Sequence, residues 1–187
     1  ITDNCDKLRT ELDINFTRTE LMEGISSLDN NKSSSFDRIT NEVLKASKQI
    51  IAKPVIILFN AILKHSLYPT GWKCDILTPL HKSDGKNEPN NFRGISVSSC
   101  FGKLFNKLLQ KRLDKLCKSK NLISDAQGSG KTGSRTSDHL MIVKFLTDKY
   151  VKQQGKNLYT CFVDLRKAFD TVPRIKMFYT LLHDYSI

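Results

Sequence analysis

The 187 residues include 39% hydrophobic and 26% charged side chains, which is ordinary for a globular protein. This length suffices for one domain, or for one domain and part of another. No apolar stretch approaches the roughly 20 residues of a transmembrane helix, and residues 1–13 lack the apolar centre of a signal peptide. We therefore expect a soluble, intracellular protein that is not secreted and has no membrane partner.

The net charge of +11 is distributed unevenly along the chain. Residues 1–80 hold 10 basic and 10 acidic side chains, whereas residues 81–156 hold 16 basic and 6 acidic ones, a net charge of +10. Lys and Arg that neutralise phosphates release condensed counterions, so this concentration favours a nucleic-acid partner. A solvated basic surface would have the same composition.

The five cysteines are far apart and odd in number. None of them has the short spacing of a zinc site, and the four histidines do not group with them. We expect reduced structural thiols at Cys5, Cys74, Cys100, Cys117 and Cys161.

A capping box predicts the start of the first helix. Thr17 can cap the amide of Glu20, Glu20 can reach back, and Phe16 can pack on Leu21. The helix is expected to end at Asn30-Asn31.

Two further helices are predicted before the chain changes character. One starts at Asp37, and the other starts at Pro54, a residue that suits a first helical turn. The apolar spacing predicts that the following residues face inward: Ile39, Val43, Leu44 and Ile50 in the first, and Val55, Leu58, Phe59 and Ile62 in the second.

A short hairpin follows. The residue pattern predicts a strand at 75–80 and a returning strand from Phe92 to Val97. The polar residues between them, 83–91, indicate a loop or turn.

The longest predicted helix runs from Ser99 to Lys118. Its apolar side chains share one face: Phe101, Leu104, Phe105, Leu108, Leu109, Leu113 and Leu116. Four lysines spaced four residues apart form a basic ridge on another face: Lys103, Lys107, Lys111 and Lys115. The ridge is either a solvated surface or a track for phosphates.

The last third begins with a Gly/Ser/Thr loop, 128–136, and a helix from about Ser137 to Val151. Leu158 to Val163 predict a strand that ends on Asp164. A last helix is predicted to begin at Asp170 or Thr171. Its apolar spacing predicts that four side chains face inward: Ile175, Phe178, Leu181 and Leu182. The expected fold class is therefore α/β (α+β), mainly helical with a small antiparallel sheet.

Asp164 is the residue most suited to chemistry. An acid at the end of a buried apolar strand is costly unless something pairs with it. Mg²⁺ accepts one or two carboxylates together with water and substrate phosphates, and two such ions can promote an in-line displacement. A strand-end Asp that caps the next turn would have the same spacing.

Residues 162–172, Phe-Val-Asp-Leu-Arg-Lys-Ala-Phe-Asp-Thr-Val, resemble the first palm motif of reverse transcriptases from non-LTR, LINE-type retrotransposons. The resemblance covers nearly the whole chain, in order. The other matching segments are 31–39, 58–60, 68–69, 72–73, 79–82, 91–96 and 127–138.

The resemblance implies a division into an N-terminal connector (1–15), fingers (16–156) and a first palm segment (157–187), with the rest of the palm and the thumb absent. The partners of such an enzyme are an RNA template, a DNA primer and a dNTP, in the nucleus and cytoplasm. Its complete active site holds two Mg²⁺ ions, with Mn²⁺ as an alternative.

The resemblance also implies residue roles. Asp164 and the backbone carbonyl of Leu165 would bind metal, and Phe169 would lie against the sugar of the nucleotide. Lys82 and Arg93 would hold its triphosphate. The charge excess of residues 81–156, and not the resemblance, leads us to expect nucleic-acid contacts at the lysine ridge, Lys131 and Arg135.

Several positions depart from the family pattern. Ser35 replaces a glycine, Phe36 replaces a frequent proline, and the basic pair of the fingers loop is reduced to Lys131-Thr132. The 187 residues also contain no Asp-Asp pair, the second metal-binding motif. We therefore expect the fragment alone to be inactive, and a non-catalytic nucleic-acid-binding relic is the alternative.

A P-loop NTPase is a second alternative, because residues 128–132 read Gly-Ser-Gly-Lys-Thr. The motif needs a glycine where Asp125 stands, and it needs a buried strand directly before the loop, where residues 120–124 are short and polar.

Overall fold

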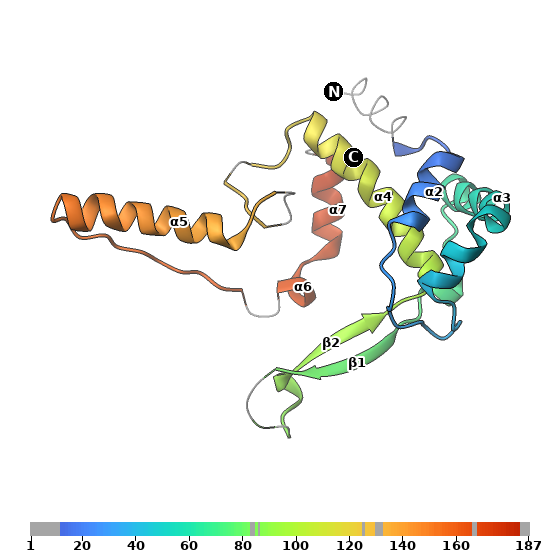
Figure 1. The fold of residues 1–187 in the computed structure, drawn as a ribbon, viewed down its shortest axis with the longest axis horizontal. Coiled ribbons are helices and arrows are strands. Elements are labelled where there is room, and N and C mark those ends of the chain that lie inside the picture. Colours follow the sequence, from blue (N-terminus) through green and yellow to red (C-terminus); the bar gives the residue numbers. More distant parts are fainter. Residues whose placement is uncertain are drawn as a thin grey trace. The chain divides into compact units, whose positions relative to one another are not determined.

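The computed structural model describes residues 12–82, 85, 87–124, 126–129, 133–165 and 168–183. The chain forms two compact units, unit 1 (residues 1–115) and unit 2 (residues 116–187). Unit 1 contains α2 (Arg18–Ser26), α3 (Asn41–His65), the hairpin of β1 (Ile76–His81) and β2 (Phe92–Val97), and most of α4 (Cys100–Ser119) (Figure 1). Unit 2 contains α5 (Thr136–Leu146), α6 (Ala168–Thr171) and α7 (Arg174–His183). The mainly helical fold with a small antiparallel sheet is confirmed.

Helix α2 (Arg18–Ser26) begins with the predicted capping box. The amide of Glu20 donates to Thr17 Oγ1 at 3.2 Å, and the amide of Thr17 donates to Glu20 Oε2 at 2.8 Å. Two orphan amides of the first turn are thereby satisfied reciprocally. The helix ends at Ser26, a few residues before the predicted Asn30.

The two helices predicted from Asp37 and Pro54 are one helix, α3 (Asn41–His65), and that prediction was wrong. Thr40 is its N-cap, and Pro54 lies inside it. Proline removes one amide and crowds the preceding turn. Packing on both sides offsets this cost, because Ala52 and Val55 are both buried in the core.

The continuous register of α3 also changes which side chains face inward. Its buried apolar residues are Leu44, Ala52, Val55, Phe59 and Ile62. Val43, Ile50 and Leu58, predicted to be inward, are 52%, 82% and 40% exposed. A single 3.6-residue period over 25 residues places them on other faces than Phe59.

Helix α3 is also long and apolar enough to cross a membrane by length and composition, contrary to the expectation that no stretch approaches that size. A core helix of a soluble protein passes the same test. Phe59 is fully buried and belongs to the core of unit 1, which accounts for part of this apolar content.

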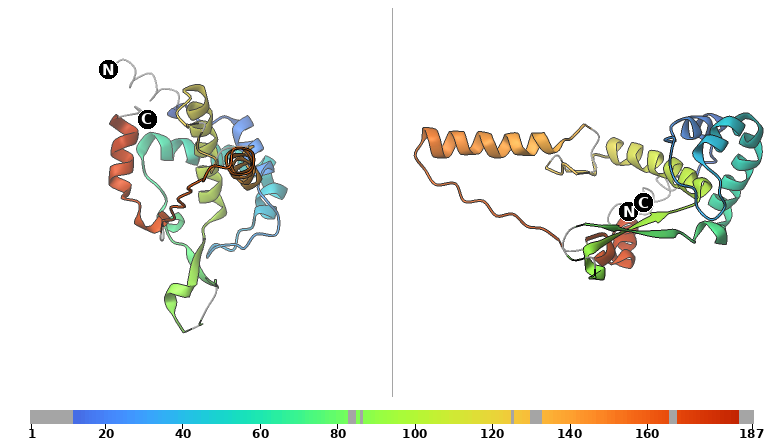
Figure 2. Two further views of the ribbon diagram at one scale, coloured as in Figure 1. Left: turned by 90° about the vertical axis from the view of Figure 1, so that its left-hand side faces the viewer. Right: turned by 60° about the horizontal axis from the view of Figure 1, so that its bottom comes forward.

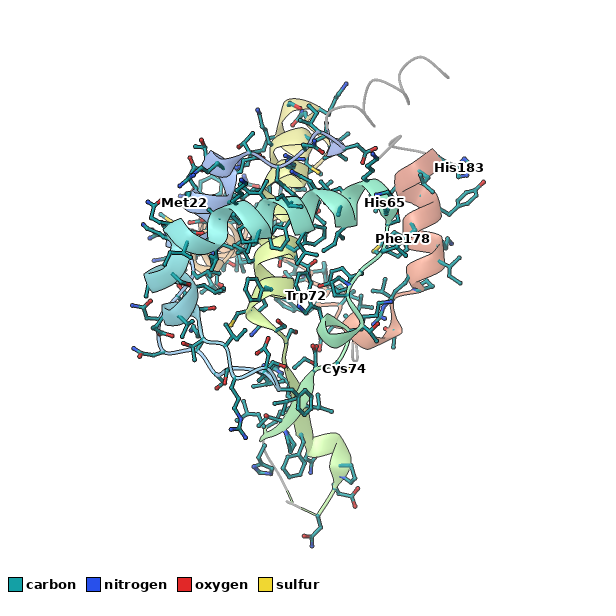
Figure 3. All side chains as sticks on the ribbon, turned by 90° about the vertical axis from the view of Figure 1, so that its right-hand side faces the viewer. Met22, His65, Trp72, Cys74, Phe178 and His183 are labelled. Atoms are coloured by element: carbon teal, nitrogen blue, oxygen red, sulfur yellow. The ribbon has the colours of Figure 1, made fainter. Side chains whose placement is uncertain are left out.

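The core of unit 1 is built around aromatic rings. Phe59 lies edge-on to Phe16, Trp72 and Phe105, with ring centroids 6.2, 6.1 and 5.2 Å apart. Edge-to-face pairs at such separations are favourable beyond their buried area. Figure 3 shows Trp72 on the connection between α3 and the hairpin, where the short helix η1 (Thr70–Trp72) lies.

Strands β1 (Ile76–His81) and β2 (Phe92–Val97) form the predicted antiparallel hairpin, with η2 (Pro89–Asn91) in its turn. Ile76 pairs with Val97 at the base, Pro79 with Gly94 in the middle, and His81 with Phe92 near the tip. Both faces of the hairpin are exposed except at its ends.

Helix α4 (Cys100–Ser119) agrees with the prediction within one residue at each end. Leu104, Phe105 and Leu108 are at most 4% exposed. A Cβ added to Gly24 would lie 2.7 Å from Leu108 Cδ2, so the glycine permits the close approach of α2 to α4.

Unit 2 contains α5 (Thr136–Leu146), the π-helical η3 (Thr147–Gln153), α6 (Ala168–Thr171) and α7 (Arg174–His183). Helices α5 and α7 contain no buried residue. Ile175, Phe178 and Leu182, predicted to face inward, are 88%, 57% and 49% exposed. The described part of unit 2 offers α7 no core in which to bury them.

The palm strand predicted at 158–163 is not confirmed. Residues 157–165 have neither helix nor strand, and Figure 2 shows the segment after η3 as an irregular trace. A strand requires a hydrogen-bonded neighbour, and the described residues of unit 2 include no strand with which it could pair.

Candidate nucleotide and nucleic-acid site

The hairpin brings Lys82 and Arg93 together. Leu80 pairs with Arg93, and the amide of Lys82 donates to the carbonyl of Asn91 at 2.9 Å, so the ladder continues one step past β1. Side chains alternate between faces along a strand, and opposite residues share a face. Lys82 and Arg93 are therefore diagonal neighbours on one face, with Cα atoms about 7–8 Å apart by the usual spacing.

This pair presents two cations near the tip of an exposed arm. Both side chains are exposed, so neither bears the cost of a buried charge. The ammonium of Lys82 is a compact point charge, and the guanidinium of Arg93 is a planar fork that matches phosphate oxygens. The arrangement suits an anionic ligand that spans several ångströms.

The lysine ridge of α4 is partly occupied by contacts with α2. Lys107 Nζ donates to the carbonyl of Ser27, the C-cap of α2, at 2.6 Å. A cation there also complements the negative end of the helix dipole. Lys111 Nζ lies 3.8 Å from Glu23 Oε2 in an exposed pair. The two remaining members, Lys103 and Lys115, are half-buried and exposed respectively.

Asp164 lies in an exposed segment instead of at the end of a buried strand. Phe162, Val163 and Leu165 are 84%, 83% and 72% exposed. Among the described residues, no group of three or more His, Cys, Asp or Glu side chains could hold a metal ion. The Asp164 carboxylate and the Leu165 carbonyl are hard oxygen donors, which fit part of a Mg²⁺ coordination shell.

Three other predicted site residues differ in how far the structure describes them. Phe169 lies in α6, and its side chain is outside the described residues, as is the whole of Lys131. Arg135 is the N-cap residue of α5, and its amide donates to Asp138 Oδ2 at 2.8 Å. Its guanidinium is exposed.

Sequence reasoning missed an arginine that joins α4 to the start of α2 within unit 1. Arg112 donates to both carboxylate oxygens of Glu20 at 2.9 and 3.0 Å, and its guanidinium carbon lies 4.2 Å from the ring centroid of Phe16. It also donates to the backbone carbonyls of Leu12, Ile14 and Asn15. The only sequence signal was Glu20 itself, an acid with a capping role.

A second missed contact joins Asp37 to the start of α4. The hydroxyl of Ser99 donates to Asp37 Oδ2 at 2.7 Å, and the thiol of Cys100 donates to the carbonyl of Ile39 at 3.0 Å. Burial raises the pKa of the Cys100 thiol. Among the described cysteines, Cys100 is buried and Cys117 is half-buried, whereas Cys74 and Cys161 are exposed.

Between α4 and the loop at 128–132, the described residues 120–124 and 126–127 form no strand. This local structure does not match the P-loop alternative, whose loop follows a buried strand.

Comparison with known proteins assigns the family. Residues 80–183 match the family described as reverse transcriptase (RNA-dependent DNA polymerase). The match covers more than half of the 187 residues and includes the hairpin tip, α4 and Asp164. The chain belongs to the reverse transcriptase family.

The similar proteins are encoded by non-LTR retrotransposons, as the resemblance predicted. The chain is 28% identical over 82% of its length to the probable RNA-directed DNA polymerase from transposon BS of Drosophila melanogaster. It is 29% identical over 84% of its length to the corresponding protein of the X-element of the same fly. It is 30% identical over 56% of its length to the Pol polyprotein of the R2 element of Popillia japonica. The chain spans 17% of the length of the first two relatives and 14% of the third.

Proposed function

We propose that the chain forms the fingers (16–156) and first palm segment (157–187) of a retrotransposon RNA-directed DNA polymerase. In the whole enzyme, a primer 3′-hydroxyl attacks the α-phosphorus of a dNTP opposite an RNA template, and the bond to the β-phosphate breaks to release pyrophosphate. The observation that carries this proposal is the register of the hairpin, which pairs Leu80 with Arg93 and so brings Lys82 beside Arg93. Two cations on one face of the arm suit a triphosphate.

In this proposal Lys82 and Arg93 bind and orient the triphosphate, and Phe169 lies against its sugar. The Asp164 carboxylate and the Leu165 carbonyl hold Mg²⁺, or Mn²⁺ in its place. The metal supplies electrostatic stabilisation of the charge that develops on the transferred phosphorus and its oxygens. Holding the reacting groups in line is the other contribution of the chain.

The nucleic-acid path of this proposal excludes Lys107, whose ammonium is held by the Ser27 carbonyl. Lys111 can exchange its exposed partner Glu23 for a phosphate at little cost, since exposed ion pairs contribute little. We assign the contacts with template and primer phosphates to Lys103, Lys111, Lys115, Lys131 and Arg135.

Binding of a labelled dNTP and of an RNA–DNA duplex to residues 1–187 tests these assignments. Lys82→Ala with Arg93→Ala should weaken dNTP binding about tenfold or more, since each cation contributes a charge-assisted contact. Lys48→Ala on α3 is the matched control and should leave binding unchanged. Duplex affinity should fall steeply with salt, and affinity indifferent to salt would contradict the basic path.

Primer extension separates the enzyme from a non-catalytic relic. Residues 1–187 contain no Asp-Asp pair, and we expect them to make no DNA, because one carboxylate does not hold two ions. In a polypeptide that carries the complete domain, Asp164→Asn should abolish Mg²⁺-dependent synthesis, whereas Asp138→Asn should not. Synthesis that survives Asp164→Asn would overturn the metal assignment.

A further inference from the structure

The hairpin of β1 and β2 is an arm whose orientation is not set by packing of its faces. All residues of both strands are exposed apart from the half-buried ends at Ile76, His81, Phe92 and Val97. An isolated two-stranded hairpin is marginally stable in water. The direction of this arm must therefore be set where its two strands join the rest of unit 1.

The entry to β1 is held by aromatic contacts. Trp72, four residues before β1, stacks on Phe101 with ring centroids 6.1 Å apart and an interplanar angle of 9°, and lies edge-on to Tyr68 at 5.6 Å. Gly102 allows this contact, because an added Cβ would lie 2.9 Å from the Tyr68 hydroxyl. This anchor belongs to the core.

The exit from β2 is held by polar contacts. Ser99 is 2% exposed and donates to Asp37 Oδ2 at 2.7 Å, and the next residue, Cys100, donates to the Ile39 carbonyl at 3.0 Å. The other carboxylate oxygen of Asp37 accepts from the amide of Ile39 at 3.1 Å. The two oxygens of Asp37 thus join its own loop to the point where β2 becomes α4.

The loop that carries Asp37 is itself firmly closed. The side-chain amide of Asn41 donates to the Asp29 carbonyl at 2.7 Å, and the amide of Asn31 donates to Glu42 Oε1 at 2.5 Å. Arg38 has a φ of 53°, uncommon for a residue with a side chain. Its amide donates to the Ser35 carbonyl at 3.0 Å, which helps hold this conformation. A closed loop gives Asp37 a fixed position from which to hold Ser99.

We propose that Asp37 is a positioning residue: through Ser99 it fixes the base of β2 and so the direction of the arm that carries Arg93 and Lys82. Ser99 lies six positions after Arg93, which is about 20 Å at the usual rise of an extended chain. A rotation of about 10° at the base would displace the tip by about 3.5 Å over that length, and displacements of about 1 Å already impair a reacting geometry. The proposal rests on the assignment of the arm to the triphosphate.

Hydrogen exchange on residues 1–187 tests the positioning directly, without any ligand. Ser99→Ala removes the donor from a buried site and changes little volume, and Ser98→Ala, one residue away, is the matched control. Ser99→Ala and Asp37→Ala should accelerate exchange of the β2 amides by about tenfold, the scale of one hydrogen bond to a charged group. Asp37→Asn keeps an acceptor and should restore most of the protection. Exchange in α3 around Phe59 should not change.

Two results would overturn the proposal. One is exchange in β2 that is the same for Ser99→Ala and Ser98→Ala. The other is acceleration in α3 as large as in β2, which would make the contact a general stabilising one. If Asp37→Ala fails to fold, the pair Ser99→Ala and Ser98→Ala decides the outcome alone.

A dNTP-binding measurement separates this proposal from the function on which it rests. Ser99→Ala should weaken dNTP binding several-fold in the wild-type chain and should have no effect when Lys82 and Arg93 are both alanine. If the double alanine variant binds dNTP as tightly as wild type, the triphosphate assignment fails. The hydrogen-exchange result still decides whether Asp37 orients the arm. If Ser99→Ala also weakens dNTP binding in the variant that lacks Lys82 and Arg93, the link between the arm and the triphosphate is overturned.

Discussion

Units 1 and 2 differ in how they bury apolar side chains. Unit 1 encloses Phe59 among aromatic rings, and thirteen buried residues form one cluster there. Helices α5 and α7 of unit 2 contain no buried residue, and large side chains such as Met141 (73% exposed) and Ile175 (88% exposed) face outward. An amphipathic pattern indicates which side chains should be buried, but burial also requires a second surface. Unit 1 contains that surface, whereas the described part of unit 2 does not.

The largest expected effect is at Phe59. Phe59→Ala should lower the free energy of unfolding by about 3–5 kcal/mol, because it removes a ring that three other rings surround. Thermal or urea unfolding measures the loss. Ile50→Ala on the same helix is the control, and its free energy of unfolding should lie within about 0.5 kcal/mol of the wild-type value. Phe178→Ala in α7 should cost less than about 1 kcal/mol, and a loss there equal to that of Phe59→Ala would contradict the comparison.

A smaller loss is expected when Arg112 is replaced. Its side chain is 12% exposed and joins α4 to Glu20 and to three backbone carbonyls. Arg112→Ala should cost about 2 kcal/mol in urea unfolding, within the range for hydrogen bonds to charged groups. Arg112→Lys keeps the charge without the planar fork and should recover part of this. Arg18→Ala, which removes one exposed bond to Gln49, should be nearly neutral.

The pH dependence of the stability of unit 1 should reveal the contribution of the Arg112–Glu20 pair. The Arg112 guanidinium lowers the pKa of Glu20 from 4.5 to about 2. A carboxyl whose pKa is depressed by folding stabilises the fold above its unfolded pKa and loses that contribution as pH falls through the folded value. The stability difference between wild type and Glu20→Gln should therefore be constant above about pH 5 and shrink between about pH 4.5 and pH 2. A difference that does not change over this range would show that the Arg112–Glu20 pair does not contribute to the pH dependence of stability.

The smallest effect is expected in unit 2. Ile175→Ser removes an apolar side chain that is 88% exposed, so the free energy of unfolding should change by less than about 0.5 kcal/mol. Binding of a dye that reports exposed apolar surface should decrease. A marked loss of stability would mean that Ile175 is buried in solution, and the contrast between the two units would then weaken.

Elements determined by nearby residues were predictable. The capping box at Thr17 and the hairpin turn depend on contacts within a few residues, and both were found where expected. Pro54 was read as a helix start because proline suits a first turn, yet core contacts on both sides keep α3 continuous. The palm strand before Asp164 was not confirmed, since a strand depends on a neighbour that its own sequence does not contain.

The candidate site divides in the same way. The side-by-side placement of Lys82 and Arg93 follows from strand register, which alternating residues and the turn determine. The contact of Lys107 with Ser27 joins residues 80 positions apart, and no local pattern distinguishes that lysine from the other three. The contact between Asp37 and Ser99 likewise spans 62 positions. Long-range polar contacts of this kind require the structure.

The proline in β1 has a consequence for how the chain behaves at high concentration. Pro79 faces Gly94 in a pair whose backbone amides and carbonyls point away from the partner strand, because hydrogen-bonded and non-hydrogen-bonded pairs alternate and the bonded pair Lys82–Asn91 lies three steps away in register. The outer edge of β1 therefore lacks one donor. A strand from another molecule that tried to extend the sheet would leave a carbonyl without a partner, and prolines on edges discourage such growth. The arm is thus protected against edge-to-edge aggregation on the side of β1.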